Sequence, residues 1–336
     1  MRAFSCDNCG RLVFFHNTSC LNCGHVLAFD WEERELRTYP PDAPPHRCAN
    51  RVLAACNAQV ADEGDACPAC LFTRTRPNDA DAEGLEGFRE AEAAKRHLLF
   101  ELGELGLPLE SYREREGGLA FDLLSSSEKP VTTGHAAGVI TLDLAESDDA
   151  RREQRRMELG EAYRTLLGHF RHEVGHYYFP ILTAEPDLLE QARAAFGDER
   201  ADYGDALERH YEEGPPDRWQ AEFVSAYATM HPSEDWAETF AHFLHIHDTL
   251  QTAAAHRMRV DGPADAELPR GPEPRSSDDF RSVIAEWLSL TYALNAINRS
   301  MGRDPLYPFV LSAPAVEKLS LVARLAREAR GDEPLG

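Results

Sequence analysis

The stretch His172-Glu173-Val174-Gly175-His176 has two histidines four residues apart, a spacing typical of a metal-binding helix. Apolar residues at helical spacing precede it, so the segment from about Asp149 to Phe179 is predicted to form one helix that ends at Pro180. Residues four apart lie on one helical face, and both imidazoles can therefore bind the same metal ion. Glu173 directly follows His172 on the helix, and its carboxylate can act as general base for a water molecule held by that metal.

A catalytic zinc ion with an open position needs a third protein ligand. Candidates lie 58 residues after His176, where Glu234 and Glu238 are four apart on another predicted helix. Either glutamate could bind the metal while the other accepts a hydrogen bond from a ligand histidine. Ser233, as an N-cap, and Asp235 are also residues that a helix start favours, which leaves a purely structural role open. The spacing alone does not choose between the two glutamates.

The chain after residue 80 is predicted to be mainly helical. A polar segment that contains a proline, residues 74–84, marks a domain boundary near residue 80. Two β-prone segments, Leu119 to Leu124 and Gly138 to Leu144, predict a small antiparallel sheet. Apolar periodicity predicts helices at 86–105, 185–196, 218–229, 234–248, 277–299 and 314–330.

All eight cysteines lie between Cys6 and Cys70, and the first four form two short pairs. Cys6-Asp7-Asn8-Cys9 and Cys20-Leu21-Asn22-Cys23 are separated by ten residues, and a glycine follows each pair, which suits a tight turn. Two such turns facing each other supply four thiolates in a tetrahedron. This is the geometry of a structural zinc site.

The other four cysteines are spaced more loosely. Seven residues separate Cys48 from Cys56, whereas Cys67 and Cys70 have the short two-residue spacing. A second four-cysteine zinc site is predicted because it leaves no cysteine over. Two buried thiols beside an incomplete site, or His46 in place of Cys48, remain alternatives. Four protein ligands leave no position for water, so both sites are expected to stabilise the fold.

Composition limits the classes of partner. The 336 residues include 58 acidic and 35 basic ones, and a net charge of −23 argues against binding nucleic-acid backbone. Residues 1–80 contain eight arginines, no lysine and ten acidic residues, so this region is expected to contact a protein rather than DNA. No apolar run reaches the roughly 18 residues of a membrane span. The start also lacks a secretory signal, so we expect a cytoplasmic protein without membrane contact.

Together these motifs resemble a bacterial family of zinc-binding metallopeptidases with an N-terminal zinc ribbon. The resemblance covers nearly the whole chain and rests on both cysteine sets, Ala94-Lys95-Arg96-His97, Leu105-Gly106-Leu107-Pro108, Gly168 to Tyr178 and His231 to His242. The catalytic part is similar, more distantly, to the protease domain of anthrax lethal factor, a gluzincin whose Glu-x-x-Ala-Glu-x-Phe motif matches Glu234 to Phe240.

The gluzincin resemblance implies roles that spacing leaves undecided. It implies that Glu234 is the third metal ligand and that Glu238 accepts a hydrogen bond from a ligand histidine. Tyr227, seven residues before Glu234, matches a tyrosine whose phenol can donate to the oxyanion of a tetrahedral intermediate. A packing role for Tyr227, as a half-buried aromatic residue on a helix, remains the alternative.

The sequence thus predicts an α+β protein with two domains. Residues 1–80 form a zinc-ribbon module with two four-cysteine sites, and residues 81–336 form a mainly helical, zincin-like metallopeptidase domain with a small antiparallel sheet. The predicted reaction is hydrolysis of an amide bond in a peptide or protein by Glu-assisted attack of zinc-bound water. Three zinc ions are expected, one catalytic and two structural. The alternative is a non-catalytic zinc-ribbon scaffold or adaptor with a zincin-like shell.

Overall fold

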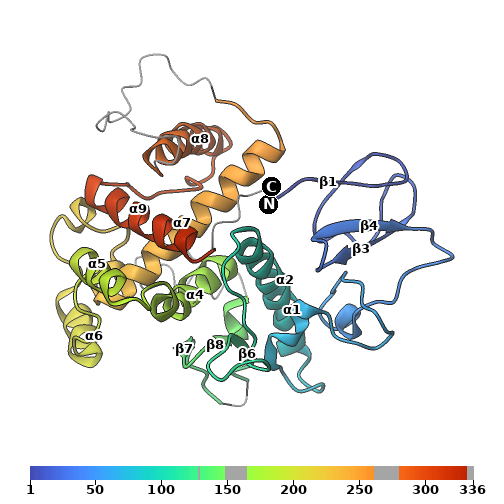
Figure 1. Cartoon of the computed structure of the whole chain (residues 1–336), viewed down its shortest axis with the longest axis horizontal. Coiled ribbons are helices and arrows are strands. Elements are labelled where there is room, and N and C mark those ends of the chain that lie inside the picture. The colour runs from blue at the N-terminus through green and yellow to red at the C-terminus, as the bar shows by residue number, and fades with distance from the viewer. Residues whose placement is uncertain (128, 148–164, 261–279, 331–336) are drawn as a thin grey trace. The chain divides into compact units, whose positions relative to one another are not determined.

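The computed structural model describes residues 1–127, 129–147, 165–260 and 280–330 (Figure 1). These residues pack into two compact units, one before Arg171 and the other from Arg171 onward. The predicted α+β class, with the cysteine-bearing module ahead of a mainly helical part, is confirmed. The boundary near residue 80 was predicted from sequence motifs. In the structure the cysteine module packs in one unit with the helix and the sheet that follow it. Within the described ranges, no helix has the length and apolar character to cross a membrane.

Two small antiparallel sheets open the cysteine module. Their paired strands are β1 (Phe4–Ser5) with β2 (Leu12–Val13), and β3 (Val26–Asp30) with β4 (Glu35–Tyr39). Three phenylalanines of this part, Phe4, Phe15 and Phe29, surround Phe100 of helix α2 (Ala82–Glu104), with ring centroids 5.1 to 6.3 Å from it. Segments this short bury little surface by themselves, and α2 therefore completes their core.

Helix α2 confirms the helix predicted at 86–105 and begins four residues earlier. The Asp81 carboxylate caps it by accepting a hydrogen bond of 2.8 Å from the Gly84 amide. The helix also buries charge. Lys95 Nζ lies 2.6 Å from Glu92 Oε1 with both side chains fully buried, and an Arg96 nitrogen lies 3.6 Å from the other Glu92 oxygen. These three residues form one buried ion cluster.

The Lys95→Met variant is expected to lower the free energy of unfolding by about 3 kcal/mol, because it removes one partner of a buried charge and leaves Glu92 undercompensated. Urea unfolding followed by circular dichroism measures this loss. Glu90→Gln, at an exposed position of the same helix, is the matched control and should stay within about 0.5 kcal/mol of the wild type. Equal midpoints for the two variants would contradict a structural role for the cluster.

The sheet of the first unit has four strands in the order β5-β6-β8-β7. Their bounds are β5 Thr73–Thr75, β6 Ala120–Leu124, β7 Gly134–Ala136 and β8 Val139–Asp143. Both predicted strands, near 119–124 and 138–144, are present as β6 and β8. Their pairing differs from the predicted antiparallel arrangement, because β6 runs parallel to both β5 and β8, and only β7 and β8 are antiparallel.

The mixed topology follows from a hairpin between β7 and β8 that was not predicted. Ala137 and Gly138 join β7 to β8 with φ angles of 49° and 85°, as in a type I′ turn. A side chain at Gly138 would collide with the Gly117 carbonyl, so glycine is required there. The chain reverses at this turn, and β8 therefore enters beside β6 in the same direction.

The helices after the sheet are α4 (Leu166–Leu182), α5 (Pro186–Phe196), α6 (Tyr203–Glu213), α7 (Pro232–Ala255), α8 (Phe280–Ser300) and α9 (Ala313–Glu328). Four predicted helices are thereby confirmed as α5, α7, α8 and α9, namely those at 185–196, 234–248, 277–299 and 314–330. Residues 277–279 of the third lie outside the described residues. In the second unit α7 packs against α5 and α9, and α8 packs against α9. Helix α6 was not predicted, although Asp202 caps it by accepting from the Asp205 amide at 2.9 Å.

The predicted helix at 218–229 is wrong. The segment contains two short 3-10 turns, Trp219–Ala221 and Tyr227–Thr229, instead of a continuous helix. Arg218 lies in the left-handed region with φ 61°, which is incompatible with a right-handed helix at that point. The apolar spacing of this segment therefore belongs to an irregular stretch that leads into α7.

The predicted end of the histidine-bearing helix is also wrong. Helix α4 continues through Pro180 to Leu182. Proline lacks the N–H that would bond the carbonyl four residues before it, but the last turn is closed by Thr183, whose amide and hydroxyl donate to the Phe179 carbonyl at 3.0 and 2.6 Å. The start of the predicted helix, residues 149–164, lies outside the described residues.

Candidate metal centre

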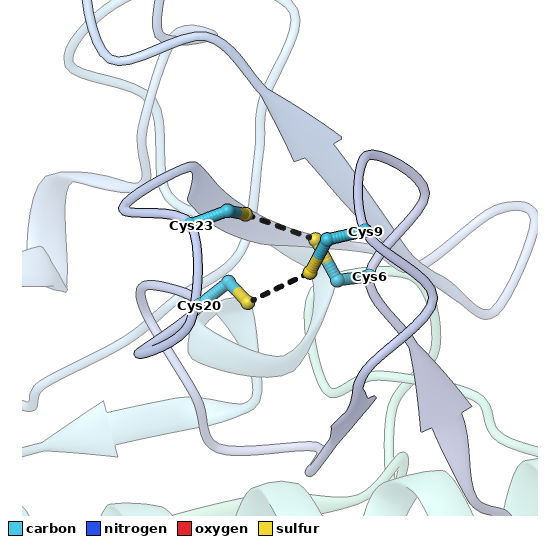
Figure 2. A group of neighbouring side chains, drawn as sticks. All are labelled: Cys6, Cys9, Cys20 and Cys23. Carbon is cyan, nitrogen blue, oxygen red and sulfur yellow. Dashed lines mark hydrogen bonds between the residues drawn. The ribbon is translucent and has the colours of Figure 1, made fainter.

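The first cysteine cluster brings together Cys6, Cys9, Cys20 and Cys23 (Figure 2). Figure 2 shows the four sulfur atoms facing one another between two turns. The sulfurs of Cys6 and Cys23, and those of Cys9 and Cys20, are 3.6 Å apart. Zinc–sulfur bonds of about 2.3 Å in a tetrahedron place sulfurs about 3.8 Å apart, so the cluster fits a zinc ion.

Each short pair of this cluster is a tight turn closed by glycine. The Gly10 amide donates to the Cys6 carbonyl and the Gly24 amide donates to the Cys20 carbonyl, both at 2.8 Å. Both glycines have φ near +70°, at 67° and 75°, where other residues are strained. The glycine after each pair thus lets the chain fold back and direct both thiols inward.

The second cluster brings together Cys48, Cys56, Cys67 and Cys70. The sulfurs of Cys48 and Cys70 are 3.6 Å apart and those of Cys56 and Cys67 are 3.7 Å apart, again near the tetrahedral separation. All four residues are buried. His46 lies outside the cluster, with Nδ1 2.8 Å from the Ala61 carbonyl oxygen, so all four donors gathered here are thiols.

The third group consists of His172 and His176 on α4 and Glu234 on α7. Both imidazole Nε2 atoms face the same carboxylate oxygen, Glu234 Oε2, at 2.9 Å from His172 and 3.5 Å from His176. Metal bonds of about 2.0–2.1 Å to nitrogen and oxygen in a tetrahedron place donors about 3.3 Å apart. The donor set and its spacing therefore fit a zinc ion.

The structure places the two glutamates on opposite edges of the His172 ring. Glu238 Oε1 lies 2.6 Å from His172 Nδ1, whereas Glu234 lies on the Nε2 side that His176 shares. A hydrogen bond from Nδ1–H to Glu238 leaves Nε2 available for a metal. The two glutamates therefore face different nitrogens of the same ring, a distinction that the four-residue spacing could not make.

The imidazoles and carboxylates of this group stabilise each other's charged forms because they lie close together. Burial opposes a charge on His172, but hydrogen bonds to the two carboxylates outweigh it and hold the pKa of this imidazole well above its usual value. Burial would raise the pKa of Glu234, yet the two imidazoles lower it far below its ordinary range. Glu234 is only 3% exposed and therefore presents a buried anionic oxygen to both rings.

A close helix contact brings the glutamates to the histidines. Gly175 lies against α7, where an added Cβ would be 3.0 Å from the Ala237 Cα. The Trp236 indole N–H donates to the Gly175 carbonyl at 2.9 Å, which fixes the register of α7 on α4. His231, rather than Ser233, caps α7, and its ring accepts from the Ser233 amide at 3.1 Å. Glu234 therefore lies in the first turn of α7 and faces His172 and His176 of the histidine motif.

Glu173 and Tyr227 lie near the same group. Glu173 is on α4 next to His172 and is 6% exposed. The Tyr227 ring lies 5.9 Å from the His172 ring and 6.1 Å from the His210 ring of α6. Burial, together with the Glu234 carboxylate, raises the pKa of Tyr227 above its usual value, so its phenol stays protonated and can donate.

One residue that contacts this group was not predicted from the sequence. Tyr203, the first residue of α6, donates from its phenol to Glu234 Oε1 at 3.2 Å. Burial and the nearby Glu234 and Glu173 carboxylates raise the pKa of Tyr203 to about 12. The only available signal was the capping residue Asp202 just before it, which indicates a helix start but not a site residue.

Comparison with known proteins places most of the chain in recognised families. Residues 84–325 match the family described as "Putative zinc-binding metallo-peptidase", and residues 3–81 match a zinc-ribbon domain. An uncharacterized protein of Mycobacterium bovis is 50% identical over 336 residues, covering 99% of this chain and 97% of the relative. An uncharacterized protein of Mycobacterium tuberculosis is similar to the same extent. No solved structure matches the chain.

Proposed function

The chain belongs to this family of zinc-binding metallo-peptidases, and from that premise we propose that it hydrolyses an amide bond in a peptide or protein. One observation carries the proposal. Two imidazole Nε2 atoms face a single buried carboxylate oxygen, and a glutamate lies next to the first of these histidines on the same helix. Two histidines, a carboxylate ligand and a general base form the arrangement of a hydrolytic zinc site.

His172, His176 and Glu234 would hold the catalytic zinc, which makes the site gluzincin-like. A zinc ion with three protein ligands keeps a coordination position open, polarises the substrate carbonyl and lowers the pKa of water to about 7. Glu238 accepts from His172 Nδ1 and so fixes the tautomer and the plane of the ring. Each of these residues comes from α4 or α7, whose contact at Gly175 is tight.

Glu173 is proposed to move the proton. Its carboxylate accepts a proton from the attacking water and then delivers it to the leaving amine, so that one residue serves both steps. Tyr227 is proposed to stabilise the tetrahedral intermediate, because its protonated phenol lies beside His172 and can donate to the developing oxyanion.

The two cysteine clusters are proposed to hold two structural zinc ions, which would supply folding energy to a module with a small core. A net charge of −2 over residues 1–80 favours a protein partner over nucleic acid for this module. Eight cysteines gathered in metal-binding groups suit a reducing compartment, and we propose a cytoplasmic location.

Zinc analysis tests the proposal against a non-catalytic scaffold. Wild-type protein purified without chelator is expected to contain three zinc ions per chain by plasma mass spectrometry. The double variant His172→Ala/His176→Ala is expected to contain two, because it retains both cysteine clusters. The matched control is His256→Ala, at an exposed position just after α7, which should retain three.

Two zinc ions in both the wild type and the double variant would contradict the catalytic site and favour the scaffold. Release of zinc by a thiol-specific mercurial identifies the ions that are bound by cysteine. The third ion should stay bound under that treatment and should leave only with a general chelator, because its ligands are nitrogen and oxygen.

A further inference from the structure

The two oxygens of Glu234 have different partners. Oε2 faces the imidazoles of His172 and His176, whereas Oε1 accepts a hydrogen bond of 3.2 Å from the Tyr203 phenol. Tyr203 lies on α6, a separate helix from those that carry the histidines and the glutamate. The third ligand is thus held from the side that faces away from the imidazoles.

Tyr203 is fixed in place although its helix buries little. Ala206 is the one residue of α6 that is buried, and Tyr203 itself is 43% exposed. The anchor is His231, whose Nε2–H donates to the Ala201 carbonyl at 3.1 Å while its ring packs at a tilt against the Tyr203 ring, with centroids 5.3 Å apart. Because His231 also caps α7, it ties the start of α6 to the start of the helix that carries Glu234.

A second contact joins Tyr203 to the proposed catalytic groups. The Tyr203 phenol lies near the Tyr227 phenol and the Glu173 carboxylate. The phenol that donates to Glu234 therefore lies beside both residues that are proposed to act on the substrate.

We propose that Tyr203 is a positioning residue that keeps Glu234 bound to zinc through one oxygen only. A carboxylate can bind zinc with one oxygen or with both, and the second mode would occupy the position that a hydrolytic site must leave open. A hydrogen bond to Oε1 favours the first mode by holding that oxygen away from the metal. This inference rests on the proposed function and adds to it a residue that controls coordination number.

The test uses the full-length Tyr203→Phe variant, which removes the hydroxyl and keeps the ring on His231. Both cysteine clusters retain zinc, and cobalt(II) is loaded into the third site alone after that site has been stripped with a chelator. Visible absorption of cobalt is expected to fall in the variant as coordination rises from four to five. The dissociation constant for the third metal, measured by chelator competition, is expected to rise by about 10-fold to 100-fold.

Tyr211→Phe on the same helix is the matched control, because Tyr211 is 69% exposed, and it should match the wild type in spectrum and affinity. An unchanged cobalt spectrum and dissociation constant in Tyr203→Phe would overturn the inference while leaving the proposed function standing. A wild-type protein that binds no cobalt at the third site would instead overturn the proposed function and this inference with it. A far-ultraviolet circular dichroism spectrum equal to that of the wild type reports that the helical second unit, which contains Tyr203, is folded in the variant.

Discussion

Glu173→Gln is expected to abolish amide hydrolysis while the zinc content stays at the wild-type value. Glutamine has nearly the same size and can fill the same buried position, which is 6% exposed in the wild type. It cannot accept a proton from water, so the variant loses general-base catalysis, which contributes about 10²-fold to 10⁴-fold to rates. Because the same group would also protonate the leaving amine, we expect a loss of at least about 10³-fold in kcat/KM.

The measurement does not require a known substrate. A bacterial proteome is incubated with wild-type or Glu173→Gln protein, and newly formed N-termini are labelled and identified by mass spectrometry. Cleavages made by the wild type supply peptides for kinetic comparison of the two proteins. The control is Glu190→Gln, at an exposed position of α5, which should cleave at the wild-type rate. Wild-type cleavage by Glu173→Gln would refute the assigned base.

Local spacing explains which parts of the candidate sites were predictable. The Cys6–Cys9 and Cys20–Cys23 pairs and the histidines of the HEVGH motif are each determined by a turn or by one helical turn, and the structure brings each group together. Seven residues separate Cys48 from Cys56, so no single turn determines their distance, yet these thiols also converge with Cys67 and Cys70. For each of these groups, the sequence indicates which residues can bind a metal ion, but it does not give their positions in the fold.

Features that depend on distant segments could not be predicted. Glu234 and Glu238 look alike in the sequence, and the contact of Gly175 with α7 decides which of them faces both Nε2 atoms. Tyr203 is 31 residues before Glu234 and carries no motif, so its phenol could be found only in three dimensions. The parallel pairing of β6 and β8 likewise depends on a hairpin whose first strand has three residues, too short to show alternation.

Glu234→Gln and Glu238→Gln form a matched pair that is expected to separate a zinc ligand from a residue that orients a ligand. Glutamine at position 234 keeps the shape but removes the anionic oxygen that faces both imidazoles, and an amide is a poor ligand for zinc. We expect this variant to lose the third zinc ion and all measurable hydrolysis. Glutamine at position 238 still accepts from His172 Nδ1, so the ring stays oriented while the charge is lost.

The Glu238→Gln variant is therefore expected to bind the third zinc about 10-fold to 100-fold more weakly and to recover most of its activity when zinc is saturating. Glu234→Gln should not recover at any zinc concentration, because its defect lies in the ligand set rather than in affinity alone. Chelator competition gives the dissociation constants, and kcat/KM at rising zinc gives the recovery. If Glu234→Gln keeps the metal and Glu238→Gln loses it, the two roles are exchanged. That exchange would require the Nδ1 edge of His172 to face the metal, against the 2.9 Å and 3.5 Å approach of the two Nε2 atoms to Glu234.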